Sequence, residues 1–358
     1  MTKICFFCGN IGWSGGTERV STMIANELVR NGYSVSFISL FGESLPHFML
    51  DSKIECMSLF KNKKPFKLIL PNVVLRLRRL LKVKNINILI DVDTILSLYS
   101  IPAKFGLDIK HLSWEHFNYR SDFRMPTRKL ARYLAAKHAN AVVTLTKRDK
   151  GYWQEAINCN AKIVSIPNPT PFSHMDSNFV AHEKIALAVG RLTEQKGFDL
   201  LLNIWSKVEA VDSEWKLYIV GDGEDKSKLE SLMYRLRLKN AEIKPFTNDV
   251  GKYYSSASIY VMTSRFEGFP MVLLEAASYG LPIISFDCDT GPDELIINQE
   301  TGLLVPSNDL DEYSNKLIQL IHDKNLRSKM EKKTIKEIKK YDVSIICNNW
   351  INLIESLH

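Results

Sequence analysis

The sequence predicts an α/β protein of two domains, each built on a doubly wound parallel sheet. Three observations carry this prediction. The 358 residues exceed the usual size of a single domain. Short runs of β-branched and apolar residues alternate with helix-like segments, as in sheets whose parallel strands are joined by helices. This alternation is broken where proline density rises from Ser165 to Val180, and it then begins again.

The first half begins with one βαβ unit. Residues 3–9 (KICFFCG) predict a buried strand, residues 17–30 predict a helix that Asn31 and Gly32 stop, and residues 34–40 predict the next strand. Three later apolar runs predict further strands, at residues 86–92, 109–114 and 140–146.

The second half repeats the alternation. Predicted strands and helices follow one another at residues 185–190, 198–208, 215–221, 228–238, 241–246, 258–264, 271–279 and 282–287. A charged tail from Asp309 to His358 predicts helices. We therefore expect domains at residues 1–170 and 171–340, and a final helix at 341–358 that packs back toward the first domain. Two such domains imply a cleft between them.

Composition narrows the class of protein. With 45% hydrophobic and 24% charged residues, the chain is typical of a soluble globular protein. The N-terminal MTKICFFCGN has too short an apolar core for a signal peptide, and no segment has the roughly 18 apolar residues of a membrane span, so a cytoplasmic location is expected. Six scattered cysteines fit reduced thiols. Cys5 and Cys8 would point to opposite faces of the first strand, which favours core packing.

A basic stretch stands out against the modest net charge of +7. From Lys61 to Lys84, nine Lys or Arg residues interleave with Leu, Ile and Val, and no acidic residue occurs. Such a basic amphipathic surface can face an anionic membrane, nucleic acid or only water. No nucleic-acid motif accompanies it, so no nucleic-acid partner is expected.

A buried carboxylate marks the second half. Residues 258–279 predict a strand, a loop and a helix, with Pro270 in the first helical turn. Glu275 lies on this helix among almost only apolar residues, so it needs a partner. Ribose hydroxyls would supply one, as would a neighbouring Arg or backbone amides. Glu267 follows the end of the strand, where open α/β sheets bind ligands.

Three more loops of the second half follow predicted strands. The segment VGRLTEQKG places Arg191 and Lys196 in the first loop, where two cations could stabilise a departing diphosphate. The segment IVGDGED places Gly221 and Gly223 in a turn that equally fits ordinary tight-turn geometry. The segment FDCDTGPDELI places Gly291 before another helix.

In this order and spacing, the motifs resemble those of the retaining glycosyltransferases of family 4, and the likeness covers nearly the whole chain. It rests on the Gly15–Gly16 loop, G-R-x4-K-G from Gly190 to Gly197, Gly221-Asp222-Gly223, and E-G-F-P-x4-E from Glu267 to Glu275. The resemblance implies the GT-B fold, in which two Rossmann-like domains face each other across a cleft.

The resemblance also implies roles for single residues. Glu275 would bind the ribose hydroxyls, and Glu267 would contact the donor sugar or lie beside the reacting centre. Arg191 and Lys196 would hold the diphosphate. Backbone contacts with the donor are expected near Gly15, Gly16, Gly221, Gly223, Gly268, Phe269 and Met271.

His116, in the segment SWEHFN, follows a predicted strand of the first domain and resembles the histidine of a Glu-His pair found there in this family. Its implied role is polar contact with the donor sugar or acceptor, or proton handling, although a lone histidine is often structural. With Glu267, Arg191 and Lys196 it completes the expected catalytic set. Glu115 and Asp93 are weaker acceptor-side candidates, since either can cap or pair locally.

Two D-x-D triplets offer a rival interpretation. Asp91-Val92-Asp93 and Asp287-Cys288-Asp289 have the spacing with which transferases of the GT-A fold hold a divalent ion on nucleotide phosphates. Here one triplet lies in each half, and each resembles an ordinary strand end. Because cations and helix amides are available for the leaving group, we expect no metal and no cofactor.

These implications describe a transferase that uses a nucleotide sugar and forms an α-linkage with retention. UDP carrying a hexose or N-acetylhexosamine is the expected donor, with GDP as the alternative nucleotide. The basic stretch, and likeness to bacterial surface-polysaccharide and O-antigen enzymes, suggest an acceptor linked to undecaprenyl diphosphate at the inner face of the cytoplasmic membrane. A GT-B sugar-nucleotide epimerase and a non-catalytic nucleotide-sugar-binding protein are the alternatives.

Overall fold

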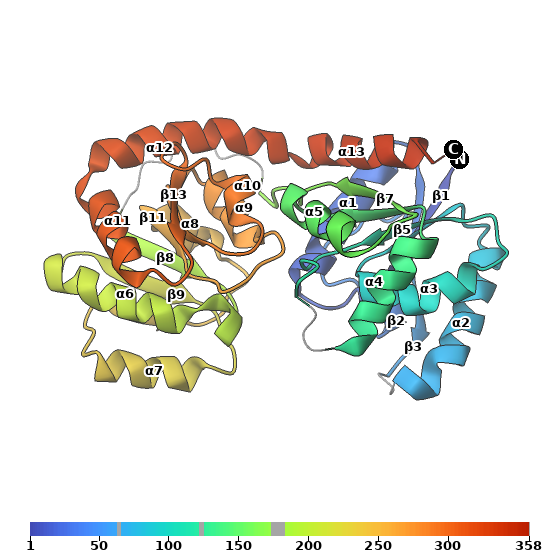
Figure 1. The fold of residues 1–358 in the computed structure, drawn as a ribbon, viewed down its shortest axis with the longest axis horizontal. Coiled ribbons are helices and arrows are strands. Elements are labelled where there is room, and N and C mark those ends of the chain that lie inside the picture. Colours follow the sequence, from blue (N-terminus) through green and yellow to red (C-terminus); the bar gives the residue numbers. More distant parts are fainter. Residues whose placement is uncertain (63–65, 122–124, 173–182, 358) are drawn as a thin grey trace. The chain divides into compact units, whose positions relative to one another are not determined.

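A computed structural model describes residues 1–62, 66–121, 125–172 and 183–357. The chain divides into two compact units. Unit 1 comprises residues 1–171 and 343–358, and unit 2 comprises residues 172–342 (Figure 1). Residues 173–180 of the expected connection lie outside the described residues, as do residues 63–65 of the basic stretch.

Unit 1 is built on a seven-stranded parallel sheet in the order β3-β2-β1-β4-β5-β6-β7. Its strands are β1 (Lys3–Cys8), β2 (Ser34–Phe41), β3 (Glu55–Phe60), β4 (Ile88–Asp91), β5 (Lys110–Trp114), β6 (Ala141–Thr144) and β7 (Lys162–Ser165). Strands are added on one side of β1 up to β3, and from β4 onward they are added on the other side. In parallel sheets of this kind, ligands bind at the carboxyl ends of the strands beside such a switch point.

Helices cover both faces of this sheet (Figure 1). They are α1 (Gly16–Arg30), α2 (Phe66–Val83), α3 (Ser97–Lys104), α4 (Pro126–His138), α5 (Lys147–Ala156) and α13 (Val343–Glu355), with a 3-10 turn η1 (Thr94–Leu96). Cys5 and Cys8 are buried in β1 with free thiols, as the strand pattern predicts. On α13, Trp350 packs against Trp114 of β5 with ring centroids 4.5 Å apart, so the C-terminal helix is part of this core.

Unit 2 is built on a six-stranded parallel sheet in the order β10-β9-β8-β11-β12-β13. Its strands are β8 (Ile185–Val189), β9 (Lys216–Val220), β10 (Ala241–Lys244), β11 (Ile259–Met262), β12 (Ile283–Asp287) and β13 (Gly302–Pro306). The order reverses between β8 and β11, so the expected nucleotide loops follow strands on both sides of the reversal.

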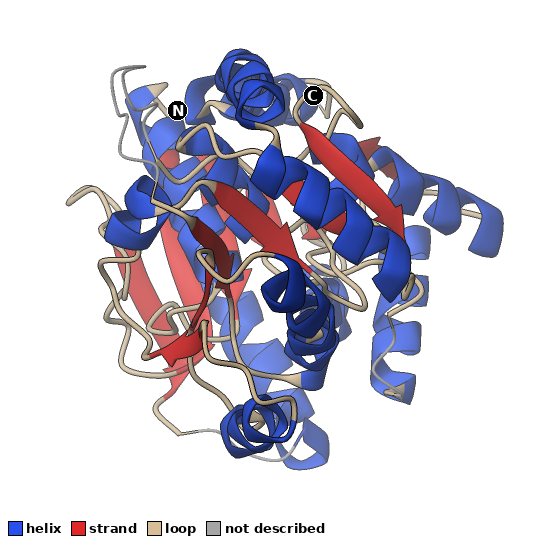
Figure 2. Ribbon diagram, turned by 90° about the vertical axis from the view of Figure 1, so that its left-hand side faces the viewer, coloured by secondary structure: helices blue, strands red, loops and turns tan. Residues whose placement is uncertain are grey.

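The helices of unit 2 also lie on both faces of their sheet (Figure 2). They are α6 (Phe198–Val211), α7 (Lys226–Arg235), α8 (Gly251–Ser256), α9 (Met271–Ser278), α10 (Pro292–Leu295), α11 (Leu310–His322) and α12 (Lys324–Glu337), with 3-10 turns η2 (Glu194–Lys196) and η3 (Ile338–Tyr341). The main core joins α6, α7 and α11 to one face. On the other face, Tyr260 of β11 stacks on Tyr254 of α8.

The predicted strands and the helical tail are confirmed, and three strands went unpredicted. β3, β7 and β13 each lie at the edge of a sheet. β3 and β7 leave most of their residues only partly buried, so the apolar pattern that reveals a central strand is weak in them. Among the helices that the structure describes, none has both the length and the apolar character needed to cross a membrane.

Residues 66–84 of the basic stretch form α2 and the turn after it, and the apolar face of α2 belongs to the core of unit 1. Ile69, Val73, Leu77 and Leu81 are buried against the sheet. These four side chains repeat at the spacing of one helix face, so the hydrophobic side of the stretch is used for folding.

Candidate functional site

Four loops of unit 2 start at the carboxyl ends of neighbouring strands. They follow β8, β9, β11 and β12, and they hold the four motifs that the sequence singled out. Because the strands are parallel, these loops lie along one edge of the sheet.

Lys196 and Glu267 meet at this edge, although 71 residues separate them in the chain. Lys196 Nζ donates to Glu267 Oε1 at 2.6 Å, and the side chains are 19% and 7% exposed. Thr290 Oγ1 donates to the backbone oxygen of Glu267 at 2.5 Å, which ties the loop after β12 to this pair. The result is a nearly buried carboxylate with an ammonium beside it, at the strand ends where open α/β sheets bind ligands.

The loops after β8 and β11 are fastened together by hydrogen bonds that the sequence did not reveal. Arg265 N donates to Gln195 O at 2.8 Å, and Gln195 Nε2 donates to Phe266 O at 3.0 Å. The Arg265 guanidinium binds both carboxylate oxygens of Asp199, at 2.9 and 2.7 Å. These bonds fix the turn that carries Lys196 against the loop that carries Glu267.

Glu275 is 6% exposed and does not stand alone in its apolar helix. Tyr254 Oη, from α8, donates to Glu275 Oε2 at 2.8 Å. Tyr254 is fully buried and stacks between Tyr260 and Tyr279, with ring centroids 5.9 and 5.5 Å away. The structure therefore supplies a tyrosine hydroxyl where the sequence suggested an arginine or backbone amides as a protein partner.

Gly221 is required by a close approach of two backbones. A Cβ built on Gly221 would lie 1.9 Å from the carbonyl oxygen of Gly190, closer than any real contact. The backbone of Gly190 in turn donates to Val220 O at 3.0 Å, and Leu192 N donates to Asp222 O at 2.8 Å. The Gly-Asp-Gly turn thus packs the loop after β9 against the loop after β8.

The remaining candidates of unit 2 are placed differently. Arg191 is not drawn in with Lys196, because its side chain is 78% exposed and its Nε lies 3.9 Å from Glu224. The ring of Phe269 is buried, 5.9 Å from the Tyr341 ring, which leaves only its backbone for a ligand. Gly268 lies two residues before Pro270, the residue that caps α9, and Met271 is the first residue of that helix, whose start favours anionic groups.

In unit 1, His116 follows β5 in a buried position. Its ring lies against Trp114, with centroids 4.4 Å apart, and the side chain is 9% exposed. Burial lowers the pKa of His116 to about 4, so the ring is neutral at pH 7. Within the described part of the chain, its buried Nε2 has no hydrogen-bond partner. A buried, unpaired nitrogen in a native structure calls for an explanation, and a binding or catalytic role is one.

The two weaker acceptor candidates are held by arginines of α4. Asp93 caps η1 and pairs with Arg128 through two bonds, at 2.9 and 3.1 Å. Glu115 is fully buried and accepts from Arg132 Nε at 2.8 Å. Both carboxylates therefore have the local partners that the sequence left open for them.

The Gly15–Gly16 loop ends at α1, with Gly15 as the capping residue and Gly16 as the first helical residue. A Cβ on Gly15 would lie 2.5 Å from Glu18 Oε2. Glu18 is 6% exposed, and burial raises the pKa of its carboxyl. Sequence reasoning missed this acid, and its oxygens suit sugar hydroxyls better than phosphate.

The D-x-D triplets lie at strand ends in separate units, with Asp91-Val92-Asp93 at the end of β4 in unit 1 and Asp287-Cys288-Asp289 at the end of β12 in unit 2. Asp91 is buried, and its Oδ2 lies 2.8 Å from His111 Nε2 and 2.6 Å from Ser100 Oγ. Across residues 1–62, 66–121, 125–172 and 183–357, no group of three or more His, Cys, Asp or Glu side chains is placed to hold a metal ion.

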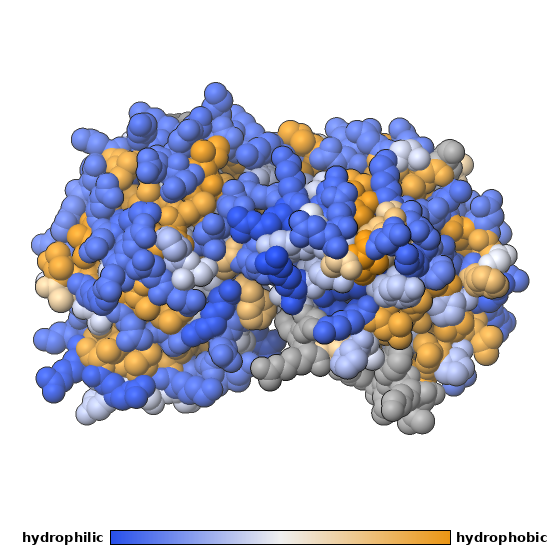
Figure 3. Space-filling model, viewed as in Figure 1, coloured by the Kyte–Doolittle hydropathy of each residue, from blue (hydrophilic) through white to orange (hydrophobic). Residues whose placement is uncertain are grey.

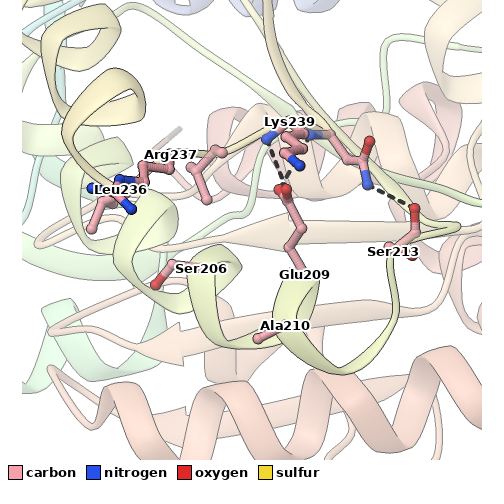
Figure 4. Close-up of a pocket in the computed structure, with 9 residues that line it drawn as sticks. Ser206, Glu209, Ala210, Ser213, Leu236, Arg237 and Lys239 are labelled. Carbon is pink, nitrogen blue, oxygen red and sulfur yellow. Dashed lines mark hydrogen bonds between the residues drawn. The ribbon is translucent and has the colours of Figure 1, made fainter.

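A cavity of about 570 Å³ in unit 2 lies away from these loops (Figure 4). It is lined by the end of α6 and the segment before β10. Glu209 points to the backbone there and accepts from the amides of Lys239 and Asn240, at 2.7 and 3.2 Å. Because these residues precede β10, the cavity lies at the amino edge of the sheet and takes no part in the site.

Two family models match the chain and together span most of it. Residues 14–173 match the model described as Glycosyltransferase Family 4, and residues 170–337 match the model described as Glycosyl transferases group 1.

Three relatives align along almost their whole length. An uncharacterized glycosyltransferase of Haemophilus influenzae is 38% identical over 99% of this chain and 100% of its own. The amylovoran biosynthesis glycosyltransferase AmsD of Erwinia amylovora is 31% identical over 99% and 100%. An α-1,4-N-acetyl-D-galactosaminyltransferase of Campylobacter jejuni, named for an acceptor on diphospho-undecaprenol, is 26% identical over 99% and 98%.

Solved structures share the fold at low identity. A mutant of S. aureus TarM, in complex with fondaparinux, α-GlcNAc-glycerol and UDP, superposes with a TM-score of 0.83, 16% identity and 99% coverage of both chains. Sucrose-phosphate synthase from Thermosynechococcus elongatus gives a TM-score of 0.86 at 16% identity, covering 100% of this chain and 99% of its own.

Proposed function

This chain belongs to the family 4 glycosyltransferases and has their α/β GT-B fold, as the motifs predict, and from that membership we propose a specific reaction. The enzyme transfers a hexose or N-acetylhexosamine from UDP to a saccharide acceptor, with retention of anomeric configuration, in bacterial polysaccharide biosynthesis. The observation that carries the proposal is the contact between Lys196 and Glu267 at the carboxyl edge of the unit 2 sheet.

The chemistry of this edge suits a departing diphosphate. The Lys196 ammonium and the amides at the start of α9 can offset the negative charge that develops on the leaving phosphate. The sugar–phosphate bond then breaks while the acceptor oxygen bonds to the same face of the anomeric carbon. The acceptor proton passes to the leaving phosphate. No divalent ion is required in this scheme, so we propose a metal-independent reaction.

The names of relatives support the choice of donor and acceptor. UDP is present in the TarM complex, and the C. jejuni relative acts on an undecaprenol-linked oligosaccharide. We therefore propose UDP as the nucleotide and a saccharide on undecaprenyl diphosphate as the acceptor.

A mass-spectrometric screen tests this proposal directly. UDP- and GDP-sugars are incubated with short saccharides on lipid diphosphate, with and without EDTA. The expected product is one sugar larger, appears with a UDP-sugar and survives EDTA. Conversion of a nucleotide sugar without acceptor would instead identify an epimerase, and activity lost in EDTA but restored by Mn²⁺ would revive the metal interpretation of the D-x-D triplets.

Glu275→Gln is expected to weaken UDP binding about ten-fold or more, because an amide replaces a charged acceptor of two ribose hydroxyls, and charge-assisted hydrogen bonds are worth about 1.5–3 kcal/mol. Glu275 lies on α9, and the glutamine that replaces it has a neutral side chain of the same shape. Calorimetric titration with UDP measures the change. Glu267→Gln serves as the matched control. Glu267 is expected to contact the donor sugar, so its replacement should lower turnover more than UDP affinity. Equal UDP affinity in folded Glu275→Gln would remove the ribose assignment.

The exposed side of α2 is the part of the basic stretch that can reach a membrane. Leu75 and Val83 are 65% and 66% exposed, and Arg79 and Lys82 are exposed beside them. The guanidinium groups of Arg76 and Arg78 bind backbone within unit 1 instead, where they donate to the carbonyls of Leu59, Ala103 and Phe105. Figure 3 shows hydrophobic side chains among hydrophilic ones over this region of unit 1. We propose that Leu75, Arg79, Lys82 and Val83 contact anionic lipid.

Replacing Arg79 and Lys82 by Gln should release the enzyme from anionic vesicles, since each basic residue gains about 1 kcal/mol near such a surface. Two charges therefore predict a loss of roughly ten- to thirty-fold in vesicle affinity. Vesicle sedimentation at low and high salt measures it. Lys207→Gln and Lys228→Gln, which remove two exposed lysines of unit 2, form the charge-matched control. Equal sedimentation of both double variants would show that this side of α2 is merely solvated.

A further inference from the structure

The loop after β5, residues 115–121, is bound by buried side chains where an ordinary surface loop would bind water. Arg132 of α4 is 2% exposed and reaches into this loop. Its guanidinium makes four hydrogen bonds there: Nε to Glu115 Oε2 at 2.8 Å, Nη1 to Tyr119 O at 2.6 Å, and Nη2 to Asn118 O at 2.9 Å and Ser121 O at 3.1 Å. One side chain thus satisfies three carbonyls of the loop.

Two acidic side chains complete the arrangement by accepting from N–H groups of the loop. Glu115 Oε1 accepts from Phe117 N at 3.1 Å, and Asp149 Oδ1, from α5, accepts from Tyr119 N at 2.6 Å. Burial, with the nearby Glu115 carboxylate, raises the pKa of Asp149 to about 8. The backbone of the loop is therefore held on both its N–H and its C=O groups by buried side chains.

Such an arrangement is costly in desolvation. Removing charged groups from water costs several kcal/mol per ion, so a buried ion pair is a poor means of adding stability. A buried polar network that is well satisfied does fix one conformation, and the conformation fixed here belongs to the loop that carries His116.

His116 lies in this loop with its ring held on one side by Trp114, which itself packs on Trp350. Its Nε2 is buried and has no partner in the described part of the chain. A flexible loop would let this ring turn toward water, where Nε2 would find a partner. The rigid loop keeps it neutral and unpaired.

We propose that Arg132 is a positioning residue for His116: its guanidinium fixes the 115–121 loop so that His116 Nε2 stays buried and unpaired until a hydroxyl of the bound sugar or acceptor supplies its partner. This rests on the proposed function for the identity of that hydroxyl. The link between Arg132 and the His116 ring does not depend on any sugar.

The test follows the His116 ring by NMR, with its signal assigned from a His116→Gln variant. Arg132→Lys keeps the positive charge beside Glu115 but cannot reach three carbonyls, because an ammonium lacks the planar fork of a guanidinium. We expect the His116 pKa to rise by about one unit or more, toward its ordinary value near 6.5. At about pH 5 the ring should be roughly one-tenth protonated in the parent and about half protonated or more in the variant.

Arg78→Lys is the matched control. Arg78 also binds backbone carbonyls in unit 1, those of Ala103 and Phe105 at the end of α3, and its two hydrogen bonds to them lie outside the 115–121 loop. Its replacement should lower the melting temperature without moving the His116 pKa. If Arg132→Lys fails to fold, Asp149→Ala, which removes the Tyr119 N–H anchor, should shift the pKa in the same direction by a smaller amount.

The outcomes separate the two proposals. An unchanged His116 pKa in folded Arg132→Lys, or in Asp149→Ala if that variant alone folds, would overturn the positioning role. An equal shift in Arg78→Lys would overturn it too, by showing a general loosening of unit 1. A shifted pKa in a protein that the sugar screen finds inactive would leave the positioning role standing and would refute the transferase reaction instead.

Discussion

Lys196→Ala is expected to lower kcat for sugar transfer by about 10²–10³, the usual cost of removing one group that stabilises developing charge. The ammonium lies 2.6 Å from Glu267, at the strand edge where the diphosphate would leave. Its loss removes the positive charge beside the leaving group. It also leaves the Glu267 carboxylate, which is 7% exposed, without this partner. Both effects raise the energy of a transition state in which negative charge grows. Initial rates at saturating donor measure kcat separately from donor binding.

Lys184→Ala is the matched control for this prediction. Lys184 also pairs with a glutamate, Glu214, but it precedes β8 whereas Lys196 follows it. Lys184 therefore lies at the amino ends of the strands and Lys196 at their carboxyl ends. Both Lys184 and Glu214 are exposed. Its replacement should leave kcat within the error of the assay. A Lys196→Ala enzyme with parental kcat, together with a large loss in Arg191→Ala, would reassign the leaving-group cation to Arg191.

Gly221→Ala is expected to destabilise unit 2 by about 3 kcal/mol, at the upper end of the range for overpacked sites. The new methyl group would lie 1.9 Å from the carbonyl oxygen of Gly190, and that oxygen belongs to backbone, so no side-chain rotation can relieve the clash. The loops after β8 and β9 would have to separate. UDP affinity should fall as well, because the same displacement moves the turn that carries Lys196. Urea unfolding followed by circular dichroism, with UDP titration, measures both changes.

Gly151→Ala is the control, because a Cβ at Gly151 does not approach another backbone; its expected effect on stability has the opposite sign. Gly151 lies inside α5, and a Cβ there would meet nothing within 4 Å. Alanine in a helix interior is favoured over glycine by about 0.5–1 kcal/mol, so this variant should be slightly stabilised. Similar stability of the Gly221 and Gly151 variants would show that the two backbones separate without cost.

Much of the fold could be predicted from local pattern, and two of the three missed strands share one cause. Central strands such as β1 and β8 are buried on both faces, so their sequences are continuous apolar runs. The unpredicted strands β3, β7 and β13 are edge strands. An edge strand has one neighbour and tolerates exposed residues, and most residues of β3 and β7 are only partly buried, so their sequences resemble loops, whereas β13 is mostly buried.

The candidate site shows the same division at the level of single residues. Glu275 could be found because a carboxylate among apolar neighbours needs a partner, but Tyr254, which donates to it, comes from another helix. Arg191 and Lys196 stand five positions apart in one motif, yet only Lys196 is brought to Glu267. The role of Arg132 had no sequence signal, because three of its four hydrogen bonds go to backbone carbonyls, which every residue carries.

Local sequence pattern was enough to specify most strands and helices, and therefore most of the loops that follow the carboxyl ends of strands, because apolar periodicity and turn residues act locally along the chain. The same pattern shows that α2 has a basic and an apolar side. Packing in three dimensions was needed to establish that the apolar side is used for the core, that Arg76 and Arg78 bind carbonyls, and that Lys196 meets Glu267. These contacts join residues that strand order and packing bring together, and a hydrogen bond depends on positions within a few tenths of an ångström that local pattern does not specify.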